Sequence, residues 1–252
     1  MSGELAKLAH QLGVPESELG CVAGVPDEDL RTLRRQIADA LFEADKHHFT
    51  RLANLAKAVP VPIAAKVSEL VLPPLLSART AEVFDPQRAA DMVNRMSARY
   101  VADVAAAMDP ARSPAVVGAM PPESVSQVGA ELAKRGEWVV VGAFVSYVSE
   151  PALEAAVEVL GGAQLLRISY ALDDMSRIDE LSALLTDQQV DDLLVAVPAD
   201  GLWRELDNLL AVLGQVGLDR LRARFAVLDP DVQAAVQAGP LAPASHEKLA
   251  AS

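Results

Sequence analysis

Hydrophobic residues recur every twelve positions through the middle of the chain. A first column of apolar residues consists of Phe84, Met96, Met108, Met120, Leu132 and Phe144. Eight residues after each of these stands a second column, Met92, Val104, Val116, Val128, Val140 and Ala152. The next residue is Val93, Ala105, Val117, Gly129, Val141 and Leu153 in turn. Such repetition predicts a stack of similar small units, and stacks of this kind usually bind other molecules rather than catalyse reactions.

Each unit is expected to be one short helix followed by a turn. Twelve is not a multiple of 3.6, so the columns would rotate around a continuous helix, and several prolines would interrupt it. The pairs Asp85-Pro86 and Asp109-Pro110 are typical helix starts, with Asp as the N-cap and Pro at the first helical position. A helix of two turns is not stable alone in water, so each must stack on its neighbours. The first column is expected to lie at the junctions between units, in the core.

The predicted fold is all-α, with an N-terminal helical segment and a superhelical stack of short, 12-residue helical repeats. Residues 1–80 form the N-terminal segment, with helices from Asp27 to about Val59 and from Ile63 to Leu72. Residues 81–236 form the repeat domain, in which Gly161-Gly162 breaks the rhythm. A looser second run has apolar residues twelve apart at Leu185, Val197, Leu209 and Leu221. Residues 237–252 are rich in Ala, Pro and Ser, which predicts a disordered tail.

Net charge and cysteine content narrow the class of protein. The chain of 252 residues has 35 Asp and Glu against 22 Lys and Arg, a formal net charge of −13. Such a surface repels phosphate backbones and anionic lipid, so no nucleic-acid partner is expected. Cys21, the only cysteine, is expected to be a small packed side chain in a reducing compartment. The start of the chain has no signal-peptide pattern and no apolar run is long enough for a transmembrane segment, so a cytoplasmic location is expected.

An acidic stretch in the second half is the candidate metal site. Its carboxylates are Asp173, Asp174, Asp179, Glu180, Asp187, Asp191, Asp192, Asp200, Glu205 and Asp207. Magnesium prefers carboxylate oxygens, and residues four apart share one helix face, so Asp187, Asp191 and Asp192 are the candidate ligands. The alternative is that these acids form a solvated outer face. Glu43 and His47 are also four apart, and His48 follows, so they could share one metal ion. The alternative is that the two His lie on the polar face of an amphipathic helix.

Three further features are candidates for contact with a partner. Arg31, Arg34 and Arg35 form a basic patch that would suit the acidic stretch of the same molecule or of another one. Trp138 lies off the apolar columns, so partial exposure and an interface role are plausible, whereas Trp203 is expected in the core. The stretch 60–76, rich in Val, Leu and Pro, would line an apolar groove or touch a membrane surface.

No motif for catalysis is visible in the sequence. There is no Gly-x-Ser-x-Gly elbow, and Gly161-Gly162 lacks the Lys and Ser or Thr of a phosphate-binding loop. We therefore expect no enzyme activity, no catalytic residues and no cofactor, apart from the open question of magnesium.

The repeat itself resembles that of a known family. The run 84–93, then Met108-Asp109-Pro110 and Met120-Pro121-Pro122-Glu123, is similar to the short-helix repeats of the intracellular N domain of MgtE-type magnesium transporters. That domain is a superhelix similar to parts of the flagellar motor protein FliG. The resemblance covers roughly residues 80–215, without the transporter's CBS pair or membrane helices. It implies a docking, scaffold or regulatory module that binds a protein, possibly a copy of itself; a magnesium or small-ligand sensor and an apolar-ligand or membrane-surface binder remain alternatives.

Overall fold

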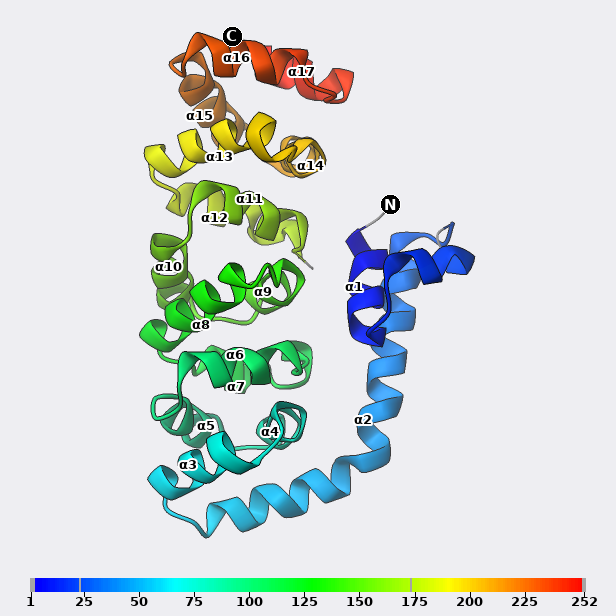
Figure 1. Cartoon of the computed structure of the whole chain (residues 1–252), viewed down its shortest axis with the longest axis vertical. Helices are drawn as coiled ribbons and strands as arrows, with labels where there is room; N and C mark the ends of the chain where they lie inside the picture. Colours follow the sequence, from blue (N-terminus) through cyan, green and yellow to red (C-terminus); the bar gives the residue numbers. More distant parts are fainter. Residues whose placement is uncertain (1–2, 23, 173, 251–252) are drawn as a thin grey trace. The chain divides into compact units, whose positions relative to one another are not determined.

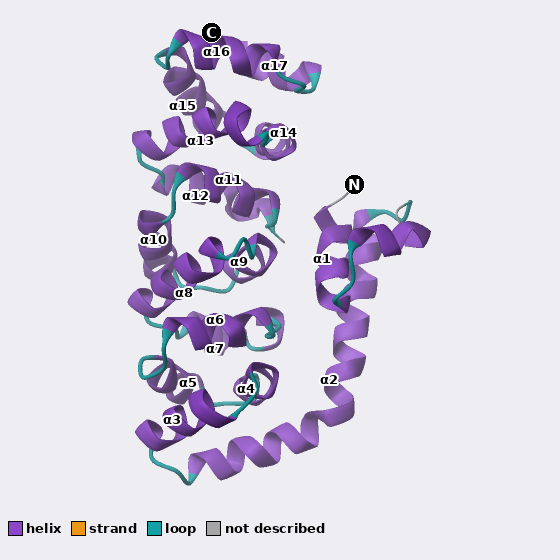
Figure 2. Cartoon of the chain, viewed as in Figure 1, coloured by secondary structure: helices purple, strands orange, loops and turns teal. Residues whose placement is uncertain are grey.

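The chain is all-helical throughout the part that the structure describes. A computed structural model describes the backbone of residues 3–22, 24–172 and 174–250. It also describes their side chains, except those of residues 3, 10, 11, 38–48, 52, 55–57 and 250. These residues form seventeen α-helices and three 3-10 helices and no strand (Figures 1 and 2). The all-α prediction is confirmed. The chain divides into two compact units, residues 1–124 and 125–252, so the division differs from the expected boundaries at 80 and 236.

The first unit contains a long helix followed by short ones. Its elements are α1 (Gly3–Leu12), η1 (Glu16–Val22), α2 (Asp27–Lys57), α3 (Val61–Val71), α4 (Pro74–Ala81), α5 (Pro86–Val93), α6 (Ala98–Ala106), η2 (Pro110–Arg112) and α7 (Pro114–Gly118). Proline begins or nearly begins α3, α4, α5 and α7, where its missing N–H costs nothing because no intrahelical acceptor is available there. The two helices expected within residues 27–72 are therefore α2 and α3.

The second unit continues the succession of short helices. After α8 (Pro122–Lys134), which begins in the first unit, the elements are α9 (Trp138–Val145), α10 (Glu150–Val159), α11 (Gly162–Tyr170), η3 (Met175–Arg177), α12 (Ile178–Leu184), α13 (Asp187–Asp200), α14 (Trp203–Val212), α15 (Gln215–Ala226), α16 (Pro230–Ala238) and α17 (Pro243–Ala250). The structure differs from the expected disordered tail at 237–252. Leu241 and Leu249 are buried in the core of this unit, and α17 packs on α14 and α15.

The helix starts explain the twelve-residue pattern and its limit. Helices begin at 86, 98, 110 and 122, and again at 138, 150 and 162. Between these two series the phase slips by four residues, because α8 continues to Lys134 and ends before Gly136, which has a φ of 77°. Consequently Leu132 and Phe144 lie inside helices and not at junctions, which corrects the prediction for these two residues.

The earlier junction residues lie where they were expected, but not all in the core. Phe84 and Met96 pack against the buried residues Ala64, Ala65 and Met92, yet Met96, Met108 and Met120 are only half-buried. The side chains of Asp85 and Asp109 accept hydrogen bonds from Arg88 N and Ala111 N, so the predicted N-caps are confirmed. Ser97 caps α6 in the same way. Thus the starts of these helices follow directly from local sequence.

Helices pack mainly on the second helix along the chain. In the first unit α2 packs on α4, α3 on α5, α4 on α6 and α5 on α7; in the second, α9 packs on α11, α11 on α13, α13 on α15 and α15 on α17. The contact between α11 and α13 is so close that a Cβ on Gly162 would lie 2.2 Å from Gln189 O. The pair Gly161-Gly162 therefore does not interrupt the repeat: Gly161 is the N-cap of α11, and Gly162 permits the close packing.

Candidate functional site

The acidic stretch contributes the first turns of α13. Thr186 is the N-cap, accepting a hydrogen bond from Gln189 N at 3.2 Å, while Gln189 Oε1 accepts one from Thr186 N at 2.8 Å. This capping box fixes the start of the helix. Asp187 occupies the first turn, where a negative charge is favourable because the helix N-terminus is positive. Asp191 follows one turn later on the same face.

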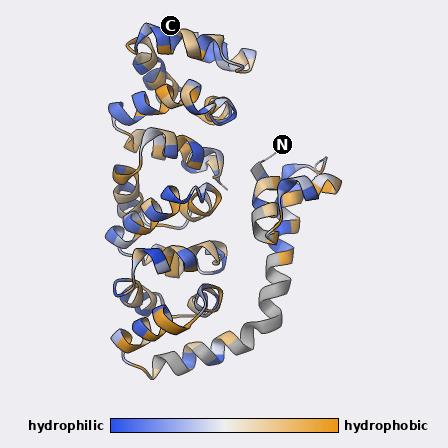
Figure 3. Ribbon diagram, in the orientation of Figure 1, coloured by the Kyte–Doolittle hydropathy of each residue, from blue (hydrophilic) through white to orange (hydrophobic). Residues whose placement is uncertain are grey.

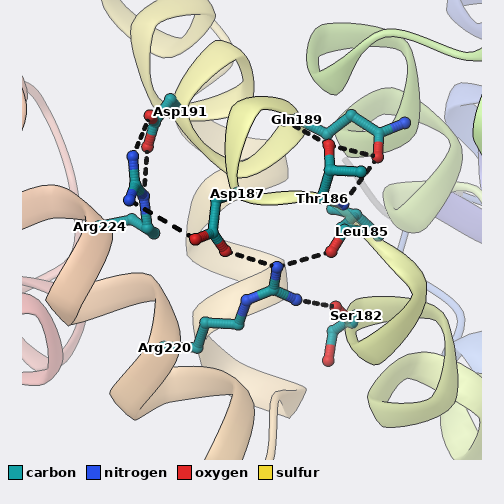
Figure 4. Close-up of polar contacts among 8 residues, drawn as sticks. All are labelled: Ser182, Leu185, Thr186, Asp187, Gln189, Asp191, Arg220 and Arg224. Atoms are coloured by element: carbon teal, nitrogen blue, oxygen red, sulfur yellow. Dashed lines mark hydrogen bonds and ion pairs between the residues drawn. The ribbon is translucent and has the colours of Figure 1, made fainter.

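Two arginines of α15 bind these carboxylates (Figure 4). Arg220 Nη2 donates to Asp187 Oδ1 at 2.8 Å. Arg224 Nε donates to Asp191 Oδ1 at 2.8 Å, its Nη2 donates to Asp191 Oδ2, and its Nη1 lies 3.6 Å from Asp187 Oδ2. The hydrogen bond from Arg220 lowers the pKa of Asp187, and the hydrogen bond to Asp191 raises the pKa of Arg224. Asp187 and Asp191 thus link α13 to α15.

Asp187 and Asp191 are already paired with cationic side chains. The guanidinium groups of Arg220 and Arg224 already neutralise Asp187 and Asp191, so a divalent cation would have to displace them. The third candidate, Asp192, accepts a hydrogen bond from Gln188 Nε2 at 2.8 Å. Within the described ranges no three His, Cys, Asp or Glu side chains gather as a metal-binding group; Asp173 lies outside these ranges, as do the side chains of Glu43, His47 and His48.

The arginine partners were not predicted, although the sequence contains a signal for them. Asp187 and Asp191 are four apart on one helix, and Arg220 and Arg224 are four apart on another. Each arginine follows its aspartate by 33 residues. Matched pairs of opposite charge at one constant separation indicate two helix faces that meet.

A second kind of link joins each of several helices to the third helix after it. In α12, Asp179 Oδ1 accepts a hydrogen bond at 2.8 Å from Gly214 N at the start of α15. In return Arg220 of α15 donates to Ser182 O at 3.1 Å and to Leu185 O at 2.6 Å, at the end of α12. The N-terminal N–H groups of one helix and the C-terminal carbonyls of the other are therefore satisfied together.

The same link occurs in both units. Between α3 and α6, Ser97 N donates to Glu69 Oε1 at 3.1 Å and Tyr100 OH donates to Leu72 O at 3.2 Å. Between α14 and α17, Ala242 N donates to Asp207 and Lys248 Nζ donates to Leu210 O. Asp179 and Asp207 of the acidic stretch thus have a structural role as partners of helix starts.

The basic patch of α2 binds α1. Glu4 is buried, and its carboxylate lies 3.3 Å from Arg31 Nη2 and 3.5 Å from Arg34 Nε. Lys7 Nζ lies 3.1 Å from the same carboxylate. Arg31 and Arg34 therefore have a partner in Glu4 of the same unit. Arg35 is exposed.

The two tryptophans are both half-buried. Trp138 packs against the core of the second unit, and the Arg167 guanidinium lies 5.6 Å from its ring centroid while bonding Asp200 at 2.8 Å. Its expected partial exposure is confirmed. Trp203 lies at the border of the core, against Gly239, where a Cβ would come within 2.1 Å of its ring. The expected burial of Cys21 is wrong, since this thiol is exposed.

A run of exposed apolar side chains on α3 and the start of α4 is the main feature without a structural explanation. Ile63, Val67, Leu70, Val71 and Leu75, called the α3 face below, are 48–70% exposed. Four of them follow the i, i+4, i+7, i+8 spacing of one side of α3, whose hydrophobic character is visible in Figure 3. The opposite side, with Ala64, Ala65 and Ser68, is buried, and α3 packs there on α5.

The charges beside the α3 face balance one another. Lys66 Nζ lies 3.9 Å from Glu69 Oε2. Hydrogen bonding from Ser97 lowers the pKa of Glu69, and Lys66 lowers it further, so this carboxylate is ionised at neutral pH. The face therefore presents apolar surface without a net local charge.

The second unit also contains a small apolar cavity. Its volume is about 70 Å³, and it is lined mainly by leucines and isoleucines, among them Leu165, Ile168, Leu181 and Leu209. A cavity that binds benzene has about 150 Å³. This space is therefore small for an organic ligand.

Comparison with known proteins assigns the chain to no family. Neither protein-family models nor curated proteins nor solved structures gave a match to the chain. Among the described helices, none has the length and apolar character needed to cross a membrane.

Proposed function

We propose that this chain is a non-enzymatic helical-repeat docking module that binds a protein partner through the α3 face. The observation that supports this proposal is the exposure of Ile63, Val67, Leu70, Val71 and Leu75 on one side of one helix. Contiguous apolar patches of this kind usually mark interaction sites, whereas single exposed apolar residues need no explanation. The helical spacing suits a partner helix, which places its own apolar residues at i, i+3, i+4 and i+7.

The energetics fit a docking site of moderate strength. Complete burial of a Val, Leu or Ile side chain contributes about 1.5–3 kcal/mol, and these five side chains are about half to two-thirds exposed. Their burial would offset much of the roughly 4–15 kcal/mol that association costs in lost freedom. A partner that buries a similar apolar area of its own about doubles this contribution, so a dissociation constant in the micromolar range is expected.

The two alternatives are less well supported by the described contacts. A magnesium sensor would use Asp187 and Asp191, which already bind Arg220 and Arg224. A membrane-surface binder would use the α3 face itself, but Lys66 is the one basic residue within 61–75 and the chain carries a net charge of −13. Peripheral proteins usually combine apolar insertion with several basic residues.

The proposal is tested by charge substitution on the α3 face. Tagged protein would carry Val67→Glu with Leu70→Glu, and the matched control would carry Val216→Glu, a substitution at an 86% exposed valine of α15. Proteins retained by the wild type and the control but lost by the double variant would support docking through the α3 face. Equal recovery by all three proteins would reject it. Flotation of the wild type with liposomes of anionic lipid would instead favour the membrane alternative.

A further inference from the structure

The packing order of the first unit leaves one helix position empty beside α3. Apart from the contacts of α1 with α2 and η1 and of η2 with α7, the main contacts here place a helix on the second helix along the chain, including α2 on α4, α3 on α5 and α4 on α6. The helix two before α3 is α1, but α1 packs on α2 through Leu5, Leu8 and Leu30. Ion pairs of Glu4 with Arg31 and Arg34 hold it there. The α3 face is thus the side on which the stack would accept one more helix.

We propose that α3 of a second copy of this chain fills this position, with the two α3 helices antiparallel across a two-fold axis. This inference rests on the proposed function and names its partner. A two-fold interface is isologous, so the same patch must be complementary to itself. The α3 face meets this requirement: an axis near Val67 places Ile63 opposite Leu70 and Val71 of the second copy, and Leu70 and Val71 opposite its Ile63.

The distribution of charge favours a second copy over an oppositely charged partner. Lys66 is paired with Glu69 within its own chain, so the face needs no charge from a partner. Residues 1–124 contain 13 Lys and Arg and 16 Asp and Glu, so the first unit carries only three of the thirteen net negative charges. Repulsion between two copies of this unit is therefore small.

The area fits a weak dimer. Five side chains of this size and exposure expose on the order of 500 Å², and two copies together would bury on the order of 1,000 Å², which is the lower limit for a specific interface. A dimer held by this face alone is expected to dissociate in the micromolar range.

Sedimentation equilibrium of the full chain between about 1 and 200 µM tests the dimer. The wild type and Val216→Glu are expected to show the same monomer–dimer equilibrium, and Leu70→Glu is expected to raise the dissociation constant by about 100-fold, because the leucine is lost from both copies. Since Leu70 is 69% exposed, circular dichroism and the melting temperature should stay at wild-type values. A wild type that is monomeric throughout, or a Leu70→Glu variant that dimerises like the wild type, would overturn the inference.

A cross-link gives a positive test that does not depend on a loss of binding. In a Cys21→Ser background, Val67→Cys places one thiol per chain near the two-fold axis, and mild oxidation is expected to give an inter-chain disulfide. Val216→Cys in the same background is expected to stay monomeric. Equal cross-linking of both variants, or none at position 67, would overturn the antiparallel pairing. If the wild type is monomeric but the α3 face still retains a different protein, the docking proposal survives without the dimer.

Discussion

Asp191 of α13 accepts two hydrogen bonds from the guanidinium of Arg224 of α15, one of them from Nε at 2.8 Å. Such side-on pairs are the strongest geometry available to these two groups, because both oxygens meet donors of a planar fork. With Asp187 and Arg220 beside it, this pair occupies the carboxylates that would otherwise attract a cation.

We therefore expect magnesium to leave the thermal stability of the protein unchanged. Addition of a few millimolar magnesium should shift the melting temperature no more than the same ionic strength of sodium chloride, because Arg220 and Arg224 would have to be displaced first. Differential scanning fluorimetry measures this directly. A magnesium-specific rise that disappears when Asp191→Asn and Asp192→Asn are combined would favour the cation-sensor alternative.

Acidification should weaken the contact between α13 and α15. The hydrogen bond from Arg220 lowers the pKa of Asp187 below its ordinary value of 3.8. A carboxylate with a depressed folded-state pKa stabilises the fold above its unfolded pKa, and this contribution is lost as pH falls through the folded-state value. The free energy of unfolding, measured in urea, should thus fall below about pH 4, and more steeply in the wild type than in Asp187→Asn. Parallel curves for the two proteins would contradict the pairing.

Glu82 is expected to act in the opposite direction. Its side chain is fully buried at the end of α4, where Oε1 accepts hydrogen bonds from Arg79 Nη1 at 2.9 Å and from Asp109 N at 3.3 Å. Burial raises its pKa above 4.5, although Arg79 and Arg112 oppose the shift. The folded state therefore binds the proton more tightly, and stability contributed by the protonated form is lost as pH rises through the raised pKa.

Replacement of Glu82 by Gln removes this titration. The Glu82→Gln protein should be at least as stable as the wild type at pH 7, and its advantage should shrink as pH falls toward 4.5, where the wild-type carboxyl becomes protonated. Urea unfolding at pH 4.5, 6 and 7 measures the trend. Glu158→Gln, at an exposed position of α10, is the control and should show no such trend. The opposite trend, in which Glu82→Gln loses stability relative to the wild type as pH rises from 4.5 to 7, would show that attraction of the carboxylate to the arginines outweighs the cost of its burial.

Gly162 should not tolerate a side chain. A Cβ there would lie 2.2 Å from Gln189 O and 2.4 Å from Leu193 N, which are backbone atoms of α13 and cannot move independently. Gly162→Ala is expected to destabilise the protein by roughly 1–3 kcal/mol, the usual cost of overpacking. The neighbouring Gly161→Ala provides a matched control, since the nearest atom to its Cβ would be Gln164 Oε1 at 3.8 Å. Ala is a less favourable N-cap than Gly, so Gly161→Ala should cost about 0.5–1 kcal/mol, and equal melting temperatures of the two variants would contradict the close packing.

Removal of the last helix distinguishes a packed C-terminus from a tail. A chain ending at Ala238 loses Leu241 and Leu249, both buried, and the hydrogen bonds of Lys248 to the end of α14. At about 1.5–3 kcal/mol for each leucine, the free energy of unfolding should fall by roughly 3–6 kcal/mol. A chain lacking only Ala251 and Ser252 serves as the control. If both chains melt at the wild-type temperature, residues 239–250 contribute nothing to the fold.

The helices of the first unit could be predicted from local sequence because their starts are encoded locally. Asp85-Pro86 and Asp109-Pro110 place cap and proline together, and both caps are formed. The periodic pattern was less informative beyond residue 122. A twelve-residue column continues through Leu132 and Phe144 while the helices change phase, since apolar residues inside a helix can satisfy the same spacing.

The candidate sites depend on contacts between distant helices, which one sequence does not reveal. Arg31 and Arg34 were recognised as a patch, but their partner Glu4 lies 27 or more residues away and is buried only once α1 has docked. Similarly, the acids of 173–207 have the composition of a cation site, and only the placement of α15 brings Arg220 and Arg224 to them. The apolar stretch 60–76 was recognised as unusual, but its division into a buried side and the α3 face required the contact of α3 with α5.

The links that join α3 to α6, α12 to α15 and α14 to α17 have a consequence for local unfolding. Asp179 of α12 binds Gly214 N, and Arg220 of α15 binds Ser182 O. Because of these two bonds, melting of either helix removes hydrogen-bond partners from both the end of α12 and the start of α15. The α3–α6 and α14–α17 links impose the same condition. Fraying therefore cannot proceed one helix at a time within these segments. The smallest cooperative block of each segment spans four consecutive helices, and amide protons within such a block should exchange with a common opening free energy.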